Sequence, residues 1–372
     1  MRKEFRHGLV IGKFYPPHAG HEYLIRSASD WCEIVTVVVM ASSVESIALS
    51  LRVEWLREIC ANSNVTIVGV MDDDPIDFES EAVWSAHIAH MQRGVSDANA
   101  LRATASMPDV VFTSEGYGAE LSRRFSAAHV CLDQSRALYP VSGTLVRSTP
   151  VQHWNHLAPC VRAHLCRRIV IVGAESTGKT TLAAALAEAL RDRGGLWART
   201  QWVPEYGREY TINKLAVSRA LDTSEPHPGI EELKWESSEF DHIATTQLHW
   251  EQQAARSSSP LLVCDTDSFA TGIWHERYLR SASNEVQSIA QRAVPRLGYI
   301  LTSWRDVDFH QDGIRDGEHI REWMHDQFAS RIPTVGTPWM LASGSAEQRL
   351  EAALEWIDKL LPTAWQFADP LG

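Results

Sequence analysis

The sequence is poor in paired cysteines and in long apolar runs. Its 6 cysteines are scattered, with neither a C-x-x-C pair nor the spacing of zinc ligands, so we expect free, buried thiols in a reducing compartment. The longest apolar run, around residues 35–41, is too short to span a bilayer. These absences predict a cytoplasmic protein without membrane insertion.

Positive charge is also scarce. The 35 Lys and Arg residues against 47 Asp and Glu residues leave a net charge of −12. Bulk attraction to nucleic acid or to anionic membranes is therefore not expected, and any phosphate chemistry must come from local sites. We expect small-molecule partners and no nucleic acid, while self-association into a homo-oligomer stays open.

What the sequence does contain is a repeated alternation of apolar runs and helical patterns. A chain of 372 residues is too long for one typical core, so two domains are expected. Apolar runs predict strands and 3.6-residue periodicity predicts helices. The expected strands are residues 7–14, 33–42, 167–173, 261–267 and 299–304, and the expected helices are residues 20–32 and 179–195.

Two separate strand–loop–helix openings predict two doubly wound, parallel sheets, which is an α/β fold. The connector lies within residues 149–168, which carry two prolines and read as a short helical linker. We therefore expect domains at residues 1–160 and 167–364. Two prolines in residues 222–229 predict an exposed loop.

The stretch "GKFYPPHAGH", residues 12–21, holds two histidines at the entrance of the first expected helix. Backbone N–H groups are free there and the helix dipole favours anions. His18 and His21 would share one face and donate hydrogen bonds to phosphate oxygens, while Gly20 lets the backbone approach a ligand closely. A metal pair lacking its third ligand and two solvated histidines are the alternatives.

A second stretch, "YPVSGTLVR" at residues 139–147, strengthens the phosphate interpretation. Ser142 and Thr144 supply hydroxyl groups, Gly143 removes a side chain, and Arg147 is suited to bidentate phosphate binding. Taken alone, such a stretch is a common turn before a helix.

Together the two stretches resemble the signature motifs of the nucleotidyltransferase superfamily, H-x-G-H and S-x-T-x-x-R. The resemblance implies adenylyl transfer from ATP without a covalent intermediate. The residues that it assigns to the ATP site are Gly12, Lys13, Phe14, His18, Gly20, His21, Ser142, Gly143, Thr144 and Arg147.

Within that superfamily, "GKFYPPHAGHEYLI", "RVEWL", "TSEGYG" and "DQSRALYPVSGTLVR" resemble the nicotinamide mononucleotide (NMN) adenylyltransferase domain of the bifunctional NadR proteins. By this resemblance Trp55 or Trp84 stacks on the nicotinamide ring, and Asp133 and Arg136 shape the nucleotide site. A tryptophan is more often a core residue than a stacking platform, which is the alternative for both.

The second half contains "GAESTGKT", residues 173–180, which matches G-x-x-x-x-G-K-[ST] between an expected strand and helix. Backbone amides of such a loop cradle phosphates, Lys179 neutralises them, and the Thr180 hydroxyl binds Mg²⁺. The expected nucleotide contacts of the loop are Gly173, Glu175, Ser176, Thr177, Gly178, Lys179, Thr180 and Thr181.

Three acidic residues are candidates for the metal and for the proton acceptor. Asp265 and Asp267 end an expected strand, and Glu205 follows a short apolar stretch in "VPEYGREY". We expect Asp265 to support the metal, Glu205 to accept the proton of an acceptor hydroxyl, and Tyr206 to pack on base or ribose. Spacing alone does not decide which acid is the base, and solvated strand-end acids are the alternative.

Residues 306–321, "DVDFHQDGIRDGEHIR", are rich in charge and glycine and predict a lid whose Arg315, with Arg321 as a second candidate, closes on phosphates. With "EYGREY" and "DTD", the stretch "DGIR" resembles the ribosylnicotinamide kinase domain of the NadR proteins. Asp267 would then contact substrate. The resemblance implies phosphorylation of nicotinamide riboside by ATP and Mg²⁺, followed by adenylylation of NMN to NAD.

The N-terminal helix-turn-helix of some NadR proteins is not expected, because the first strand starts close to the first residue and the net charge is −12. Two alternative functions remain. One is another adenylyltransferase–kinase fusion, acting on phosphopantetheine and dephospho-coenzyme A. The other is a regulator that senses nucleotides without turning them over.

Overall fold

The computed structural model describes residues 3–77, 79–221, 229–294 and 296–371. The chain divides into two compact units, Met1–Val161 with Trp365–Gly372, and Arg162–Ala364. The division falls inside the expected connector. The sequence carried no expectation for the last eight residues, which belong to the first unit. The expected loop at 222–229 lies, apart from Gly229, outside the described residues.

The first unit contains a five-stranded sheet flanked by helices. Its strands are β1 (Phe5–Gly12), β2 (Cys32–Ala41), β3 (Val65–Met71), β4 (Val110–Thr113) and β5 (Ala128–Cys131). Its helices are α1 (Ala19–Trp31), α2 (Leu49–Ile59), α3 (Glu81–Arg102), α4 (Gly118–Phe125), α5 (Gly143–Ser148) and the 3₁₀ turn η1 (Trp154–His156), and α6 (Pro159–Leu165) crosses the division.

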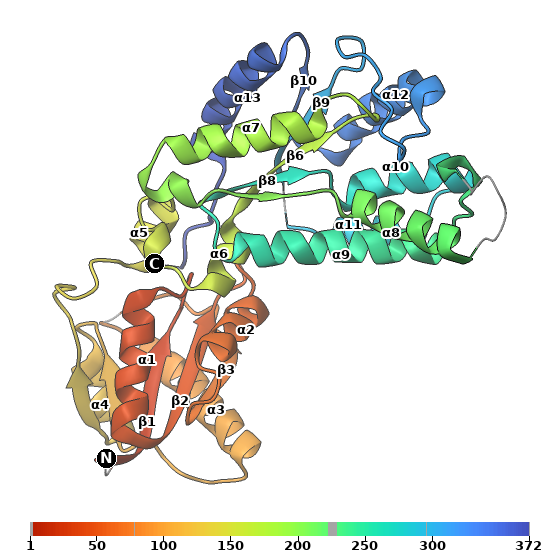
Figure 1. Cartoon of the computed structure of the whole chain (residues 1–372). Helices are drawn as coiled ribbons and strands as arrows, with labels where there is room; N and C mark the ends of the chain where they lie inside the picture. The colour runs from red at the N-terminus through yellow and green to blue at the C-terminus, as the bar shows by residue number, and fades with distance from the viewer. Residues whose placement is uncertain (1–2, 78, 222–228, 295, 372) are drawn as a thin grey trace. The chain divides into compact units, whose positions relative to one another are not determined.

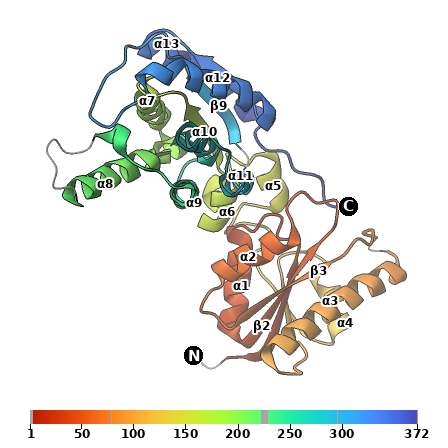
Figure 2. The ribbon, with the colours of Figure 1, turned by 90° about the vertical axis from the view of Figure 1, so that its right-hand side faces the viewer.

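This sheet is parallel throughout, in the order β3-β2-β1-β4-β5. Helices α1 and α2 cover one face and α3 and α4 the other, as Figure 2 shows. Strands β1 and β2 are buried on both faces, which explains their continuous apolar runs. The strand order reverses between β1 and β4, the point where such sheets bind ligands.

The second unit has its own five-stranded sheet. Its strands are β6 (Arg167–Val172), β7 (Gln201–Val203), β8 (Leu261–Asp265), β9 (Arg296–Thr302) and β10 (Trp339–Ala342). Its helices are α7 (Lys179–Asp192), η2 (Gly195–Arg199), α8 (Tyr206–Leu221), η3 (Ile230–Glu232), α9 (Ser237–Ala255), α10 (Ser268–Leu279), α11 (Asn284–Gln291), η4 (Glu318–Ile320), α12 (Arg321–Arg331), η5 (Ile332–Val335), α13 (Ala346–Leu360) and η6 (Leu361–Thr363).

The second sheet is also parallel, in the order β10-β9-β6-β8-β7. Helices α7 and α13 cover one face, and α9, α10 and α11 lie on the other side, as Figure 1 shows. The prediction of two doubly wound, parallel sheets is therefore confirmed. Because all strands are parallel, the segments after β6, β7 and β8 leave the sheet at the same edge.

The expected helices and strands agree with the structure to within a few residues. The helices after α7 had no matching expectation. Among the described residues, no helix is long and apolar enough to cross a membrane.

Gly94 tests the packing of α3 on the first sheet. A Cβ atom at this position would come within 2.8 Å of a methyl group of Val38 and within 3.2 Å of Val70. Gly94→Leu should lower the free energy of unfolding by roughly 1–3 kcal/mol, the usual cost of overpacking a filled core. Urea unfolding measures it, and Ser96→Leu, at an exposed position of α3, is the matched control. Equal midpoints for the two variants would contradict this packing.

Candidate active sites

The two histidines of the first unit lie where β1 leads into α1. His18 precedes the helix and His21 lies in its first turn. Their rings stack with centroids 3.7 Å apart, so the structure brings the pair onto one face. Among the described residues, the Nδ1 atoms of both rings are buried and have no hydrogen-bond partner. A ligand that enters here would meet unsatisfied ring nitrogens.

Burial keeps both imidazoles uncharged in the free protein. Burial, together with the neighbouring His21 and Arg136, lowers the pKa of His18 far below its usual value. Burial also lowers the pKa of His21, to about 3, and Arg136 adds to this effect. At neutral pH each ring therefore has one N–H group to donate and one nitrogen that accepts.

Small and aromatic neighbours hold these rings in place. The Phe14 ring lies 4.8 Å from the His21 ring, and Phe14 has the positive φ of 46°. A Cβ atom at Gly12 would come within 3.3 Å of the Phe14 ring, and one at Gly20 within 3.2 Å of the His18 ring. Both glycines thus permit the close packing that orients the histidines.

The second motif meets the first at the backbone of Tyr15. Ser142 caps α5 by accepting a hydrogen bond from the Leu145 N–H at 3.2 Å. A Cβ atom at Gly143 would come within 2.9 Å of the Tyr15 carbonyl oxygen. Arg147 donates to this same oxygen at 2.7 Å and to Thr144 at 3.3 Å. The two motifs, far apart in the sequence, therefore form one site.

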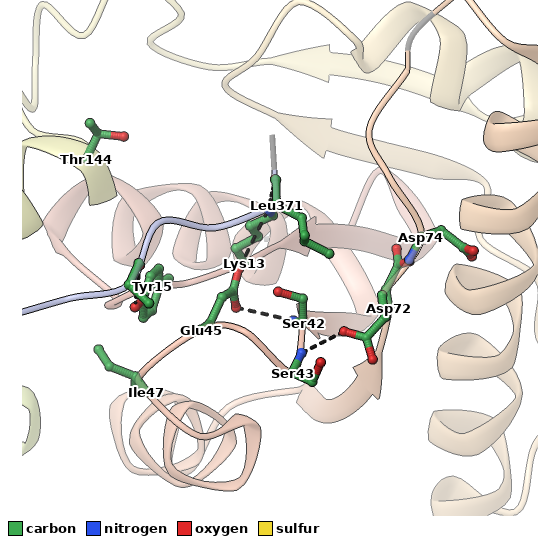
Figure 3. Close-up of polar contacts among 12 residues, drawn as sticks. Lys13, Tyr15, Ser42, Ser43, Glu45, Ile47, Asp72, Asp74, Thr144 and Leu371 are labelled. Carbon is green, nitrogen blue, oxygen red and sulfur yellow. Dashed lines mark hydrogen bonds and ion pairs between the residues drawn. The ribbon is translucent and has the colours of Figure 1, made fainter.

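A buried ion pair lies next to Lys13. Glu45 accepts from Arg52 at 2.6 Å, and both side chains are fully buried. The Lys13 ammonium lies 3.6 Å from Glu45 and donates to the Leu371 carbonyl oxygen at 2.8 Å, as Figure 3 shows. Burial lowers the pKa of Lys13, and Glu45 opposes that shift. The sequence analysis did not identify Glu45, which belongs to no motif, or Arg52, because within "RVEWL" it singled out only Trp55.

A largely apolar cavity opens beside Lys13. It has Trp84 in its wall but not Trp55, which is buried in α2. The structure therefore brings only one of the two candidate tryptophans to the site. The cavity is lined by Ile11, Gly12, Lys13, Met40, Ala41, Ser42, Asp72, Asp74, Ile76, Asp77, Trp84, His87, Met91, Tyr117 and Leu371.

Asp133 and Arg136 lie on the surface before the second motif. The Asp133 carboxylate accepts the N–H groups of Leu138 and Tyr139, each at 3.0 Å, and these bonds lower its pKa. Arg136 pairs with Glu115 at 2.8 Å. Asp133 thus shapes the loop that leads to α5.

Asp72, Asp74, His87 and His90 form a second group that the sequence analysis missed. His87 pairs with Asp72 at 2.6 Å, and His90 pairs with Asp74 at 3.1 Å. Asp72, Asp74 and His90 each place a ligand atom within 4.8 Å of the others. The run of three aspartates directly after a buried strand was the available signal.

In the second unit the loop of residues 173–180 needs glycine at two positions. Gly173 has a φ of +150°, and a Cβ atom there would come within 2.4 Å of the Thr302 hydroxyl oxygen. Gly178 has a φ of +80°, in the left-handed region, and precedes α7. The first backbone N–H groups of α7 point into the loop, a geometry that binds phosphate.

Lys179, Thr180 and Asp265 meet at the centre of this loop. The Lys179 ammonium donates to the Ala174 carbonyl oxygen at 2.9 Å, and the Thr180 hydroxyl donates to Oδ2 of Asp265 at 2.5 Å. Among the described residues, Oδ1 of Asp265 is buried without a partner, and burial raises the pKa of this carboxyl group. Hydroxyl and carboxylate oxygens are the ligands that Mg²⁺ prefers, so these two residues fit the ion.

The other side chains of the loop stabilise its shape. The Thr177 hydroxyl donates to the Ala174 carbonyl oxygen at 2.9 Å and lies 2.7 Å from the Thr302 hydroxyl. Glu175 pairs with Arg277 at 3.1 Å and accepts the Gly317 N–H at 2.7 Å. Glu175 thus ties the loop to the segment that we expected to be a lid.

That segment was expected at residues 306–321; residues 303–317 contain neither helix nor strand, and η4 and the first residue of α12 follow them. The Ser176 hydroxyl accepts from the His310 N–H at 2.8 Å, and Arg315 donates to the His310 carbonyl oxygen at 2.6 Å. Arg315 lines the cavity above the loop, as does Thr181. Arg321 instead is buried and donates to backbone carbonyls, including that of Ser176 at 3.1 Å.

Glu205 follows the carboxyl end of β7 and lines the same cavity. Burial raises its pKa to about 7; the charge of Lys179 opposes this shift, and the charges of Asp265 and Glu175 add to it. Its neighbour Tyr206 points elsewhere, with its hydroxyl 3.0 Å from the His242 ring nitrogen. The structure therefore brings Glu205 to the cavity but not Tyr206.

Asp267 is also not brought to the cavity. One carboxylate oxygen caps α10 by accepting the Ala270 N–H at 3.1 Å. The other accepts from Arg296 at 3.1 Å and from the Tyr299 hydroxyl at 2.8 Å. The side chain is 2% exposed, so Asp267 anchors the strand end instead of facing a ligand.

Four aromatic residues of the cavity wall were missed by the sequence analysis: Trp235, Phe240, Trp274 and Tyr278. The Trp235 and Tyr278 rings lie 5.1 Å apart. The cavity is lined by Glu175, Ser176, Thr177, Gly178, Lys179, Thr180, Thr181, Glu205, Gly207, Arg208, Thr211, Trp235, Phe240, Ile243, Gln247, Thr266, Thr271, Trp274, Tyr278, Ile314 and Arg315. The high aromatic content of residues 235–278 was the available signal.

Comparison with known proteins gives matches over most of the chain. A family model described as an AAA domain matches residues 168–349. The trifunctional NAD biosynthesis/regulator protein NadR of Escherichia coli K12 is 23% identical over 325 residues, which cover 83% of this chain and 71% of the relative. The protein of the same name from Salmonella typhimurium LT2 is 23% identical over 331 residues, covering 84% and 72%.

Two solved structures have the same fold. A NadR protein in complex with NR has a TM-score of 0.67 and 18% identity, covering 97% of this chain and 96% of its own. A NadR protein in complex with NAD and AMP-PNP has a TM-score of 0.71 and 18% identity, covering 97% and 98%. The folds of the two units thus occur, in the same order along the chain, in NadR structures.

Proposed function

We propose that this chain is a bifunctional enzyme of NAD biosynthesis, which phosphorylates nicotinamide riboside to NMN and adenylylates NMN to NAD. The proposal rests on two sites in one chain whose residues suit phosphate binding. One contains the stacked histidines and Arg147, and the other is the loop in which Thr180 donates a hydrogen bond to Asp265. The names of the relatives, and the NR, NAD and AMP-PNP of the related complexes, support the same substrates.

The roles follow the two units. Residues 1–160 would form the adenylyltransferase domain and residues 167–364 the riboside kinase domain. Both use ATP, with Mg²⁺ as the accompanying ion. The net negative charge of the chain and the small cavities fit small-molecule partners in the cytoplasm and no nucleic acid.

In adenylyl transfer a phosphate oxygen of NMN attacks the α-phosphorus of ATP, and pyrophosphate leaves. The stacked rings of His18 and His21 and the Lys13 ammonium belong to the segment from the end of β1 to the start of α1, and the Arg147 guanidinium binds the Tyr15 carbonyl oxygen of the same segment. They would bind the phosphates and stabilise the charge that grows on phosphorus and on the leaving group. The hydroxyls of Ser142 and Thr144 complete the ATP site.

The apolar cavity beside Lys13 provides a place for the nicotinamide ring. Trp84 in its wall offers an aromatic surface, and Lys13 at its edge would hold the NMN phosphate. Asp133 supports this site indirectly, through the loop before α5.

In the kinase the riboside 5′-hydroxyl oxygen attacks the γ-phosphorus of ATP, its proton moves to Glu205, and ADP leaves. Lys179 and Arg315 bind phosphate oxygens from the loop and from residues 303–317. Bound Mg²⁺, held by Thr180 and Asp265, would neutralise phosphate charge. The aromatic wall of Trp235, Trp274 and Tyr278 suits a planar nicotinamide ring.

The deciding experiment is incubation with ATP, Mg²⁺ and nicotinamide riboside, with products identified by mass. NMN and NAD are expected. Turnover of phosphopantetheine and dephospho-coenzyme A in place of the riboside would instead identify a coenzyme A enzyme. Binding of NAD or ATP without turnover of any of these substrates would identify a regulator.

His21→Ala should abolish NAD formation from NMN and leave riboside phosphorylation intact. The imidazole would stabilise charge in the transition state of one reaction only, and removing such a donor costs roughly two to three orders of magnitude. Pyrophosphate release and ADP release measure the two reactions separately. Loss of both in a folded variant would refute independent sites.

Lys179→Ala should give the opposite pattern. Its ammonium lies within the phosphate loop, so riboside kinase turnover should fall by roughly two orders of magnitude or more while NMN adenylylation persists. The same two assays apply, and Lys359→Ala, at an exposed position of α13, is a control for loss of surface charge. Normal kinase activity of Lys179→Ala would remove the loop from the active site.

Glu205 should give the kinase a titratable base. The pKa of about 7 means that the carboxyl group is protonated, and cannot accept a proton, below neutral pH. The kcat/KM for riboside phosphorylation should therefore fall as the pH decreases through about 7. Glu205→Gln should lower kcat at saturating Mg²⁺ and flatten this part of the profile.

Asp265→Asn is the companion variant, because it changes the proposed metal ligand and keeps Glu205. It should raise the Mg²⁺ concentration needed for half-maximal kinase activity. If Asp265→Asn flattens the acidic limb while Glu205→Gln retains it, the two roles are reversed.

A further inference from the structure

The last described residues of the chain lie on the proposed NMN site. Residues Phe367–Leu371, here called the C-terminal strap, belong to the first unit although they follow the second in the sequence. In Figure 3 the C-terminal ribbon passes Tyr15 and reaches Leu371 beside Lys13. The strap is thus an extended peptide seated on the end of β1.

Polar contacts hold the strap at one end. The Tyr15 hydroxyl donates to the Ala368 carbonyl oxygen at 2.9 Å, and the Ala368 N–H donates to the Ser46 hydroxyl oxygen at 3.1 Å. The hydroxyls of Tyr15 and Ser46 are themselves 2.6 Å apart. The Phe367 ring meets the Tyr15 ring edge-on at 6.3 Å. These contacts fix the backbone direction of the strap.

The other end of the strap uses groups that the proposed reaction needs. The Leu371 carbonyl oxygen accepts from the Lys13 ammonium at 2.8 Å, and Leu371 lines the cavity that also contains Trp84. Burial lowers the pKa of the Arg147 guanidinium. The negative charge of Asp369 is among the charges that oppose this shift. A carbonyl oxygen therefore contacts one of the two cations assigned to phosphate, and the charge of a carboxylate acts on the other.

A phosphate bound at Lys13 would have to share the ammonium with the strap. The Lys13 side chain is 35% exposed, its ammonium lies 3.6 Å from Glu45, and the Leu371 carbonyl accepts one of its three N–H groups. A charge-assisted bond to phosphate is stronger than a bond to a neutral carbonyl. An incoming nucleotide can therefore displace the strap, at a cost in free energy.

We propose that the C-terminal strap docks in the adenylyltransferase site and competes with nucleotide phosphate for Lys13. The strap raises the nucleotide concentration that this unit needs and leaves the chemistry of transfer unchanged. The inference rests on the proposed function for the role of Lys13.

The first test is a chain that ends at Trp365. Its KM for NMN or ATP in adenylyl transfer should fall about tenfold, the effect of two or three ordinary hydrogen bonds, with kcat unchanged. Riboside phosphorylation, on the other unit, should not change. An unchanged KM would refute competition, and a raised KM would show that the strap completes the site.

Phe367→Ala in the full-length chain gives the same test without truncation, since it removes the ring that contacts Tyr15. It should lower the KM about threefold, which corresponds to the free energy of one aromatic contact. Gln366→Ala, at the exposed position before the strap, is the matched control and should change nothing.

A binding experiment separates the strap from the proposed function. A synthetic peptide of residues 366–372 is titrated into the chain that ends at Trp365, with inorganic tripolyphosphate as the competitor. We expect the peptide to bind and tripolyphosphate to abolish this binding. If this result is obtained but neither chain adenylylates NMN, only the proposed function fails. Peptide binding that tripolyphosphate leaves intact, or no peptide binding, would overturn the inference.

Discussion

Both candidate sites depend on one constraint, the parallel arrangement of every strand. In a parallel sheet all carboxyl ends lie at the same edge, so segments distant in the sequence converge there. Asp265 and Glu205 reach the loop of residues 173–180 only because β7 and β8 run parallel to β6. The buried apolar runs of these strands fix their register, and the register fixes the distances among the polar groups.

The burial that stabilises the sheets also sets the charges at their edges. In the first unit burial keeps His18 and His21 neutral, so each ring offers one N–H group without a fixed positive charge. In the second unit burial raises the pKa of Glu205 into the neutral range, and the charge of Lys179 limits the rise. The pKa values of these three groups therefore depend on the packing of the core, because a looser core would return each group to its ordinary pKa.

The sequence predicts the features whose signals are local. The strands, the phosphate loop and the histidine pair each lie within about ten consecutive residues, and the structure shows the same elements there. It does not predict partners that come from far along the chain. Asp267 looks like a free strand-end acid, yet Arg296 and Tyr299, 29 and 32 residues away, bind it. Leu371 reaches Lys13 across 358 residues, and no local pattern reports such a contact.

The nucleophiles of the two proposed reactions differ in their need for a base, although carboxyl groups line both cavities, Asp72, Asp74 and Asp77 in the first unit and Glu175 and Glu205 in the second. A phosphate monoester is already largely ionised at neutral pH, so adenylyl transfer to NMN needs no base. In the first unit the buried Glu45 is held by Arg52 at 2.6 Å and serves to orient cations. A riboside hydroxyl must lose its proton, and in the second unit Glu205 lines the cavity with a pKa of about 7. The raised pKa of Glu205 thus matches the hydroxyl nucleophile proposed for the second site.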